Sequence, residues 1–320
     1  MSSSNNKRWG KHHKDHRDWS KYNDELVVRG EFYLDLGFSE HWDEELEEMN
    51  KGKRGSPYKF PNQFVNLMAA WHQLVDYRGL EGIGRRLAEY KLIPYFGDYT
   101  TLWNRIHNIK PKIIMPDYKD LELSSDGTGL KTSNAGEYRL FKYGDPDRNR
   151  KRYLVVVITA DIRKKKLYNL EVHVQGEGPS EPEVAQKHIK QASKDGYKIG
   201  KFYGDSAYDT NTMFDTLHAV GSEPVIKIRK NAAPENIRGS KHRRKEAREY
   251  KKEGYRVWAD NKSYGMRWVG TEGTFSAVKR KFGENTVSRS KEGLIAEGYQ
   301  RFWLYDTMKC YAESRIGGTI

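Results

Sequence analysis

The chain has 320 residues, with 57 Lys and Arg against 44 Asp and Glu, and a formal net charge of +13 at pH 7. This length suits one large and one small domain, and the positive balance indicates a polyanionic partner rather than an acidic protein. A single cysteine, Cys310, excludes an internal disulfide and a cysteine-rich zinc site. No apolar stretch reaches about 18 residues, so we expect no membrane span, no signal peptide and a cytoplasmic location.

The first part of the chain is predicted to be a tail followed by a helical domain. Residues 1–18 are polar and rich in Lys, Arg and His, and we interpret them as a disordered basic tail without metal ligands. Over 19–112 the apolar residues recur at spacings of three and four, which predicts a small all-helical domain. Helices are expected at 61–75, at 79–90 and from Thr100 onward.

The last two of these helices fit either a helix-turn-helix or a plain layer of a helical bundle. The positive charge of the chain favours contact with DNA. On that interpretation the exposed side chains of the third helix, including Thr101 and Arg105, are candidates for DNA binding.

From residue 113 onward the pattern changes to strands and helices in alternation. Alternating and β-branched runs at 119–130, 152–161 and 166–175 predict three strands in an antiparallel meander. A helix at 180–196, a strand at 199–205, a helix at about 210–220, a strand at 223–229 and a helical region from about 270 follow. The order predicts an α/β domain over 113–320, with a mixed sheet flanked by helices.

A basic segment at about 231–262 interrupts this order. Arg243, Arg244 and Lys245 lie in its middle, with hardly an aliphatic residue nearby. Such a run is either a solvated helix face or a surface that holds DNA phosphates.

Three acids lie where a metal site could form. Asp126 lies on the first strand beside Gly127, and Asp205 ends the fourth strand. If these two strands are neighbours, both carboxylates could reach one metal ion, with Glu272 of the last helical region as the third acid. Carboxylate oxygens suit Mg²⁺, and a pair of such ions can promote phosphodiester cleavage. Taken singly, each acid also fits a turn or a surface position, and Asp209 is expected to cap the following helix.

The combination of these residues resembles a known family. Asp126 in a strand, GDSAYD at the end of another strand, and Tyr264, Arg267, Glu272, Phe275 and Lys279 after them resemble the DDE transposases of bacterial and archaeal insertion sequences. The resemblance is to the group with a Y-x2-R-x3-E-x6-K signature, matched here by Tyr264, Arg267, Glu272 and Lys279. It extends over roughly 19–310, since YRGLEGIGRRLAEY and DYTTLWNRI are similar to helical segments of one subgroup. Four residues separate Arg267 from Glu272, where the signature has three.

The resemblance implies an RNase H-like catalytic domain in which Asp126, Asp205 and Glu272 hold two Mg²⁺ ions, with Mn²⁺ as a substitute. Water would act in cleavage at the 3′ end of the element, and the 3′ hydroxyl would then attack target DNA. Tyr264, Arg267 and Lys279 would hold DNA near the cleavage point. The implied partners are the terminal inverted repeats, target DNA and a second copy of the chain, in the nucleoid of a prokaryote.

Two other functions remain open on the sequence. One is a catalytically inactive, domesticated DNA-binding protein, although retention of all three acids argues against it. The other is a nuclease on the same fold that cuts DNA without joining it, which the sequence does not distinguish from a transposase.

Overall fold

The computed structural model describes residues 7–8, 11–12, 18–132, 153–235 and 238–317. The expected tail at 1–18 therefore lies mostly outside the described residues. Within it, only Asp18 and an antiparallel pair of two-residue strands, β1 (Lys7–Arg8) and β2 (Lys11–His12), are described.

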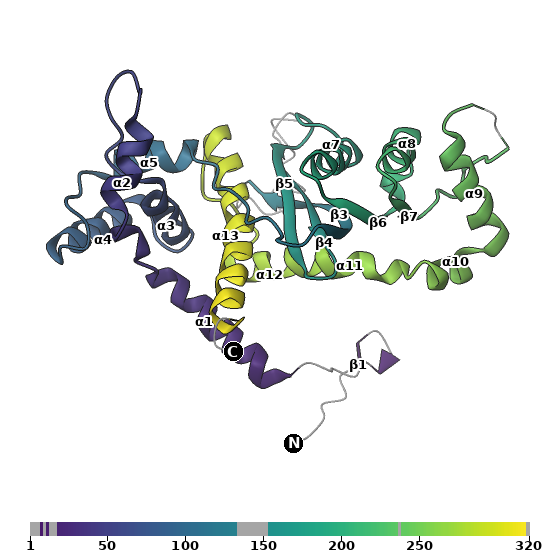
Figure 1. The fold of residues 1–320 in the computed structure, drawn as a ribbon, viewed down its shortest axis with the longest axis horizontal. Coiled ribbons are helices and arrows are strands. Elements are labelled where there is room, and N and C mark those ends of the chain that lie inside the picture. The colour runs from purple at the N-terminus through teal and green to yellow at the C-terminus, as the bar shows by residue number, and fades with distance from the viewer. Residues whose placement is uncertain (1–6, 9–10, 13–17, 133–152, 236–237, 318–320) are drawn as a thin grey trace, which may run out of the picture.

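The helical region lies at one end of the molecule (Figure 1). Its helices are α1 (Trp19–Glu31), α2 (Trp42–Asn50), α3 (Asn62–His72), α4 (Tyr77–Glu89) and α5 (Tyr99–Asn108), with short 3-10 helices η1 (Phe32–Leu34) and η2 (Gly37–Ser39). The apolar residues of α3 include Phe64 and Met68, which are completely buried. Asp98 caps α5 by accepting a hydrogen bond from the backbone nitrogen of Thr100. The three helices expected from the sequence are confirmed.

The second region contains one five-stranded sheet. Its strands are β3 (Asp120–Lys131), β4 (Tyr153–Asp161), β5 (Lys166–Val174), β6 (Lys198–Gly204) and β7 (Glu223–Ile226), in the spatial order β5-β4-β3-β6-β7. The strands β3, β4 and β5 form an antiparallel meander, whereas β6 is parallel to β3 and β7 is parallel to β6. This mixed sheet has the RNase H-like arrangement that was expected, with the first and fourth strands of the domain side by side.

Helices cover both faces of the sheet. On one face lie α7 (Glu181–Lys194) and α8 (Asn211–Ala219), packed against Leu121, Leu123 and Phe202. On the other face, α12 (Glu272–Phe282) and α13 (Lys291–Gly317) pack against Leu154 and Ile158. The strand alternation of β3 and β4 sends successive side chains to these two cores.

The basic segment after β7 forms two helices, α9 (Lys241–Glu253) and α10 (Tyr255–Asn261), at the far end from the helical region (Figure 1). A 3-10 turn η4 (Tyr264–Met266) and the short α11 (Arg267–Gly270) lead from them into α12. The helical region expected from about 270 is thus three helices, of which α13 also contacts α1, α3 and α5. Among the described residues, no helix is long and apolar enough to cross a lipid bilayer.

Candidate active site

Asp126, within β3, and Asp205, directly after β6, lie at equivalent distances along two neighbouring parallel strands. The last paired residues of β3 and β6 are Ser124 and Tyr203, and each aspartate follows two positions later. On its other side Asp126 is opposite Ile158, which belongs to the core under α12 and α13. Because residues opposite each other in a sheet share a face, the side chain of Asp126 points toward α12.

Glu272 comes to this face as the first residue of α12. The preceding helix α11 is fixed on β3, since the hydroxyl of Ser124 donates to the carbonyl oxygen of Arg267 at 2.9 Å. Gly270 lies directly over β4, because a Cβ there would be 3.3 Å from the Cβ of Ala160. The two contacts place the exposed Glu272 side chain near the strand that carries Asp126.

The electrostatics of Asp126 reflect its acidic surroundings. Burial raises the pKa of Asp126 to about 6, and the neighbouring charges of Asp205 and Glu272 add to this effect. The positive charge of Arg267 and a hydrogen bond from the backbone nitrogen of Gly127 oppose it. Burial also raises the pKa of Glu272, again opposed by Arg267. The charges of Asp205 and Glu272 therefore lie close enough to Asp126 to raise its pKa.

Glu181 is a fourth carboxylate at this site, which the sequence analysis did not single out. A Cβ on Gly127 would lie 2.3 Å from its Oε1 atom, so the carboxylate occupies the space above that glycine. Burial raises the pKa of Glu181, and the charges of Asp126 and Asp205 contribute. Glu181 is the first residue of α7, whose N-terminal dipole favours a negative charge.

These side chains suit a divalent cation by their chemistry. Carboxylate oxygens are the preferred ligands of hard cations, and a cation would offset the repulsion that contributes to the raised pKa of Asp126. As the side chains stand, no three Asp, Glu, His or Cys residues of the described part of the chain enclose a metal position. Binding of an ion here therefore requires rotation of one or more carboxylates, which are half-buried or exposed.

Arg267 stays beside the acids despite the extra residue in the signature. The helical conformation is interrupted between α11 and α12 at Thr271, whose φ of −104° and ψ of −67° depart from the usual α-helical values. The guanidinium of Arg267 lies 3.9 Å from the ring centre of Trp268 and 4.9 Å from that of Tyr264. Its Nε atom is buried without a hydrogen-bond partner among the described residues.

The other two signature residues differ in their exposure. Tyr264 is only 3% exposed and packs against Trp258, with 5.1 Å between the ring centres. The ring was expected to hold DNA near the cleavage point, but it is packed inside the protein. Lys279 is partly exposed on α12, seven residues after Glu272.

The basic residues chosen on the interrupting segment take different positions on α9. Lys245 is 75% exposed, and Arg244 donates a hydrogen bond to the carbonyl oxygen of Gly239. Arg243, which was expected to reach DNA, instead points inward and forms a two-pronged ion pair with Asp209. Asp209 therefore does not cap α8 as expected, because Thr210 takes that role.

The two candidates on α5 also differ. Thr101 is exposed. Arg105, expected to be exposed, is held by the carbonyl oxygen of Phe60 at 2.9 Å and the side-chain oxygen of Asn62 at 2.7 Å, and lies over the Tyr58 ring. Its donors are thus directed to the helical region itself.

The chain matches models of one known protein family. Two family models, each described as a transposase DDE domain, match residues 27–135 and 118–305. The second match spans more than half of the chain, so the chain belongs to the DDE transposase family. Members of this family cleave and join DNA and generally use divalent metal ions.

Solved structures give weaker likenesses. The piggyBac transposase in a synaptic complex with hairpin DNA is 12% identical, with 92% of this chain and 76% of that chain covered and a TM-score of 0.37. The Mos1 strand transfer complex is 8% identical, with coverages of 83% and 80% and a TM-score of 0.28. At these values the superpositions are loose, and membership of the family depends on the domain matches.

Proposed function

We propose that this protein is the transposase of an insertion sequence, which cleaves DNA at the element's ends and joins the freed 3′ end to target DNA. The observation that carries the proposal is that Asp126 and Asp205 each lie two positions beyond the last paired residues of the neighbouring parallel strands β3 and β6, with the charge of Glu272 on α12 near Asp126. Membership of the family supports a reaction in which DNA is cleaved and joined. In our proposal the three acids form the site of that reaction.

In this proposal Asp126, Asp205 and Glu272 hold two Mg²⁺ ions, for which Mn²⁺ can substitute. The ions would provide charge neutralisation at the reacting phosphate and a more acidic attacking water or 3′ hydroxyl. The protein residues orient the ions and the DNA strand. Arg267 lies beside the acids, where its positive charge can stabilise the phosphate that undergoes cleavage.

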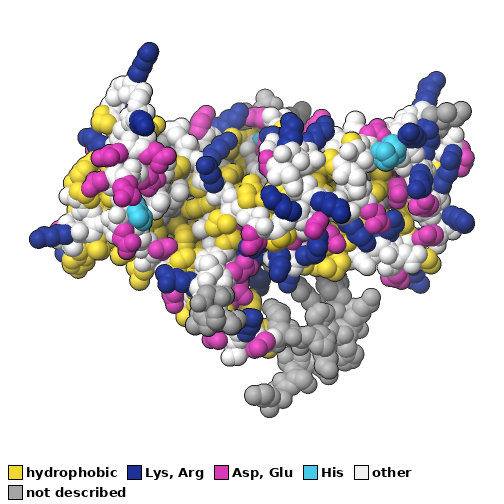
Figure 2. All heavy atoms as spheres, viewed as in Figure 1, with side chains coloured by type: hydrophobic (Ala, Val, Ile, Leu, Met, Phe, Trp, Pro, Cys, Tyr) yellow, Lys and Arg dark blue, Asp and Glu magenta, His cyan; other side chains and the backbone are white. Residues whose placement is uncertain are grey.

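The proposed DNA surface is the exposed side of α9. Four exposed basic residues recur on one helical face at spacings of three and four: Lys241, Lys245, Arg248 and Lys252. Figure 2 shows Lys and Arg side chains gathered at this end of the molecule. Arg244 and Lys279, with Thr101 on α5, are further candidates, whereas Arg243 and Arg105 have their guanidinium groups directed inward. Joining requires two DNA ends, so we propose a homodimer on DNA.

The test is a cleavage and joining assay with the DNA that flanks the gene. We expect Asp126→Ala, Asp205→Ala and Glu272→Ala each to abolish Mg²⁺-dependent cleavage while binding to the DNA ends persists. Asp260→Ala, which removes an exposed acid of α10, serves as a control and should retain the wild-type rate.

The outcomes separate this proposal from the alternatives. Cleavage without transfer of the 3′ end to a second duplex would identify a nuclease. Binding without cleavage by the wild-type protein, at any divalent metal concentration, would identify an inactive DNA-binding protein. Wild-type cleavage by any one of the three alanine variants would remove that acid from the site.

A further inference from the structure

The segment that carries Asp205 is held from outside the acidic site. It comprises Asp205, the one-turn helix η3 (Ser206–Tyr208) and Asp209. Arg229, which follows β7, donates from Nε to the carbonyl oxygen of Ser206 at 2.9 Å and from Nη2 to that of Ala207 at 3.2 Å. The Ser206 carbonyl also accepts from the backbone nitrogen of Asp209 at 3.4 Å, so Arg229 adds a second donor there and holds two backbone carbonyls of this segment.

A second arginine holds the other end of the segment. Arg243 of α9 donates to both carboxylate oxygens of Asp209, with distances of 2.6 Å and 2.9 Å. The Asp209 side chain has no exposed surface, and the backbone nitrogen of Arg229 donates to it as well, at 2.9 Å. A two-pronged contact of this kind fixes both the distance and the orientation of the two groups.

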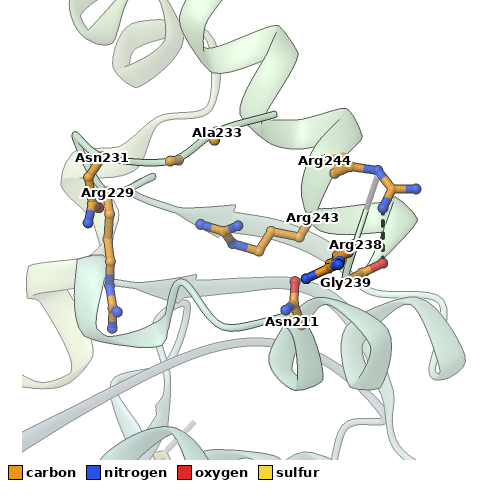
Figure 3. A pocket seen from close by; sticks show the side chains of 9 residues that line it. Asn211, Arg229, Asn231, Ala233, Arg238, Gly239, Arg243 and Arg244 are labelled. Carbon is orange, nitrogen blue, oxygen red and sulfur yellow. Dashed lines mark hydrogen bonds between the residues drawn. The ribbon is translucent and has the colours of Figure 1, made fainter. Parts of the chain in front are cut away.

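Both arginines line one pocket of about 370 Å³ between α8, α9 and the segment after β7. Figure 3 shows the Arg243 side chain extending from α9 across this pocket toward Arg229. The two side chains therefore connect the basic helix to the segment that follows β6.

The position of the Asp205 carboxylate depends on this segment. Its Oδ1 atom accepts a hydrogen bond of 2.6 Å from the backbone nitrogen of Ala207, whose carbonyl oxygen Arg229 holds. The backbone carbonyl oxygen of Asp205 accepts a hydrogen bond from the backbone nitrogen of Tyr208. A shift of η3 would thus move the Asp205 side chain directly, because β6 ends one residue earlier, at Gly204.

We propose that Arg229 and Arg243 are positioning residues, which orient Asp205 for binding a divalent ion by holding η3 and Asp209. This inference rests on the proposed function. It gives α9 two roles: its exposed basic face binds DNA phosphates, and Arg243 on its inner side fixes the segment that bears a catalytic acid.

The experiment compares Arg229→Lys and Arg243→Lys, which keep the charge and remove the forked contacts. Mn²⁺ binding to the full chain without DNA is measured by the loss of the free-ion electron paramagnetic resonance signal. The Mg²⁺ concentration for half-maximal cleavage and the affinity for DNA ends are measured in parallel. Lys245→Gln and Lys252→Gln on the outer face of α9 are the matched controls.

We expect both lysine variants to bind Mn²⁺ about tenfold more weakly, as is typical when a supporting contact behind a metal ligand is lost. Their half-maximal Mg²⁺ concentration should rise by a similar factor, with DNA affinity unchanged and the rate restored by excess Mn²⁺. The outer-face controls should lose DNA affinity at unchanged Mn²⁺ affinity.

Two results would overturn the inference. Unchanged Mn²⁺ affinity with weaker DNA binding would make the arginines phosphate contacts, and a lower rate at every metal concentration with unchanged Mn²⁺ affinity would make their role purely structural. If Arg243→Lys fails to fold, Arg229→Lys decides, since it leaves the Asp209 ion pair intact. Failure of the proposed function would give a different result. In that case the wild-type protein would show no Mn²⁺ binding that is lost in the Asp205→Ala variant.

Discussion

The carboxylate of Asp126 couples the stability of the fold to pH. Its pKa of about 6 in the folded protein exceeds the usual value near 4. The folded state therefore keeps a proton that the unfolded chain releases, and stability from this group falls as pH rises from about 4 to 6. Asp126→Asn removes this loss, so we expect it to raise the melting temperature without metal at pH 7 by roughly 2–4 °C, allowing for solvent screening.

The measurement is thermal unfolding of both proteins in a chelator at pH 4 and pH 7. Asp306 is also buried with a raised pKa, so the comparison uses only the difference between wild type and variant. If the melting temperatures of wild type and variant differ by the same amount at both pH values, the surroundings of Asp126 do not raise its pKa.

Gly127 tests the place of Glu181 in the site. In Gly127→Ala the new Cβ would overlap the Glu181 carboxylate, which must rotate away from Asp126 and Asp205. Since a flexible side chain can move at little cost, we expect near-normal stability but cleavage slower by on the order of tenfold to a hundredfold. The control is Gly129→Ala on the same strand, where the nearest contact is a Tyr153 ring carbon at 3.1 Å. Equal single-turnover rates for the two variants would exclude Glu181 from the site.

At the level of residues, local sequence patterns predicted the three acids but not the residues that lie against them or hold them in position. Asp126 lies within β3 before Gly127, and Asp205 directly follows Gly204 at the end of β6, and both arrangements are local patterns. Glu181 begins a helix with a capping box, so the sequence shows only a helix start, and its position over Gly127 follows from packing of α7 on the sheet. The ion pair of Asp209 with Arg243 joins residues 34 positions apart, and no local pattern contains it.

At the level of elements, α9 determines how salt affects DNA binding. Each phosphate contact releases counterions, so the slope of log affinity against log salt changes by about 0.9 for each contact. We expect a triple variant with Lys241, Lys245 and Arg248 changed to Gln to flatten this slope by about 2–3 units. Lys190→Gln with Lys194→Gln on α7 is the control. A slope unchanged in the triple variant would make the α9 face a merely solvated one.

The strands and most helices of the fold could be predicted because their apolar periodicity is clear. β3, β4 and β5 agree with the expected runs within a few residues. The break at Thr271 could not be predicted, since it follows from the anchoring of α11 on β3 through Ser124. The inward orientation of Arg105 similarly depends on carbonyl and amide groups more than forty residues away.

At the level of the whole molecule, α13 joins the two regions that the sequence places on either side of residue 112. Trp303 and Met308 pack with Ala70 of α3, and the Trp303 indole donates to the carbonyl oxygen of Lys112. The same helix packs on β5. Because α13 packs against both regions, we expect them to unfold together.

We expect Trp303→Ala to destabilise the entire chain by about 3–5 kcal/mol, with one unfolding transition seen by both circular dichroism and tryptophan fluorescence. Trp268→Ala, at an exposed tryptophan, is the control for the change in fluorescence. Two separate transitions, with only one of them shifted, would show that α13 does not couple the regions.

The central claim is that Asp126, Asp205 and Glu272 together bind divalent ions. The most direct measurement is anomalous X-ray diffraction from crystals of the full chain with Mn²⁺ and DNA. The account predicts anomalous peaks within roughly 2.5 Å of carboxylate oxygens of Asp126 and Asp205, with Glu272 turned toward at least one of them. Ordered carboxylates with no anomalous peak between them, or Mn²⁺ bound only elsewhere, would contradict it.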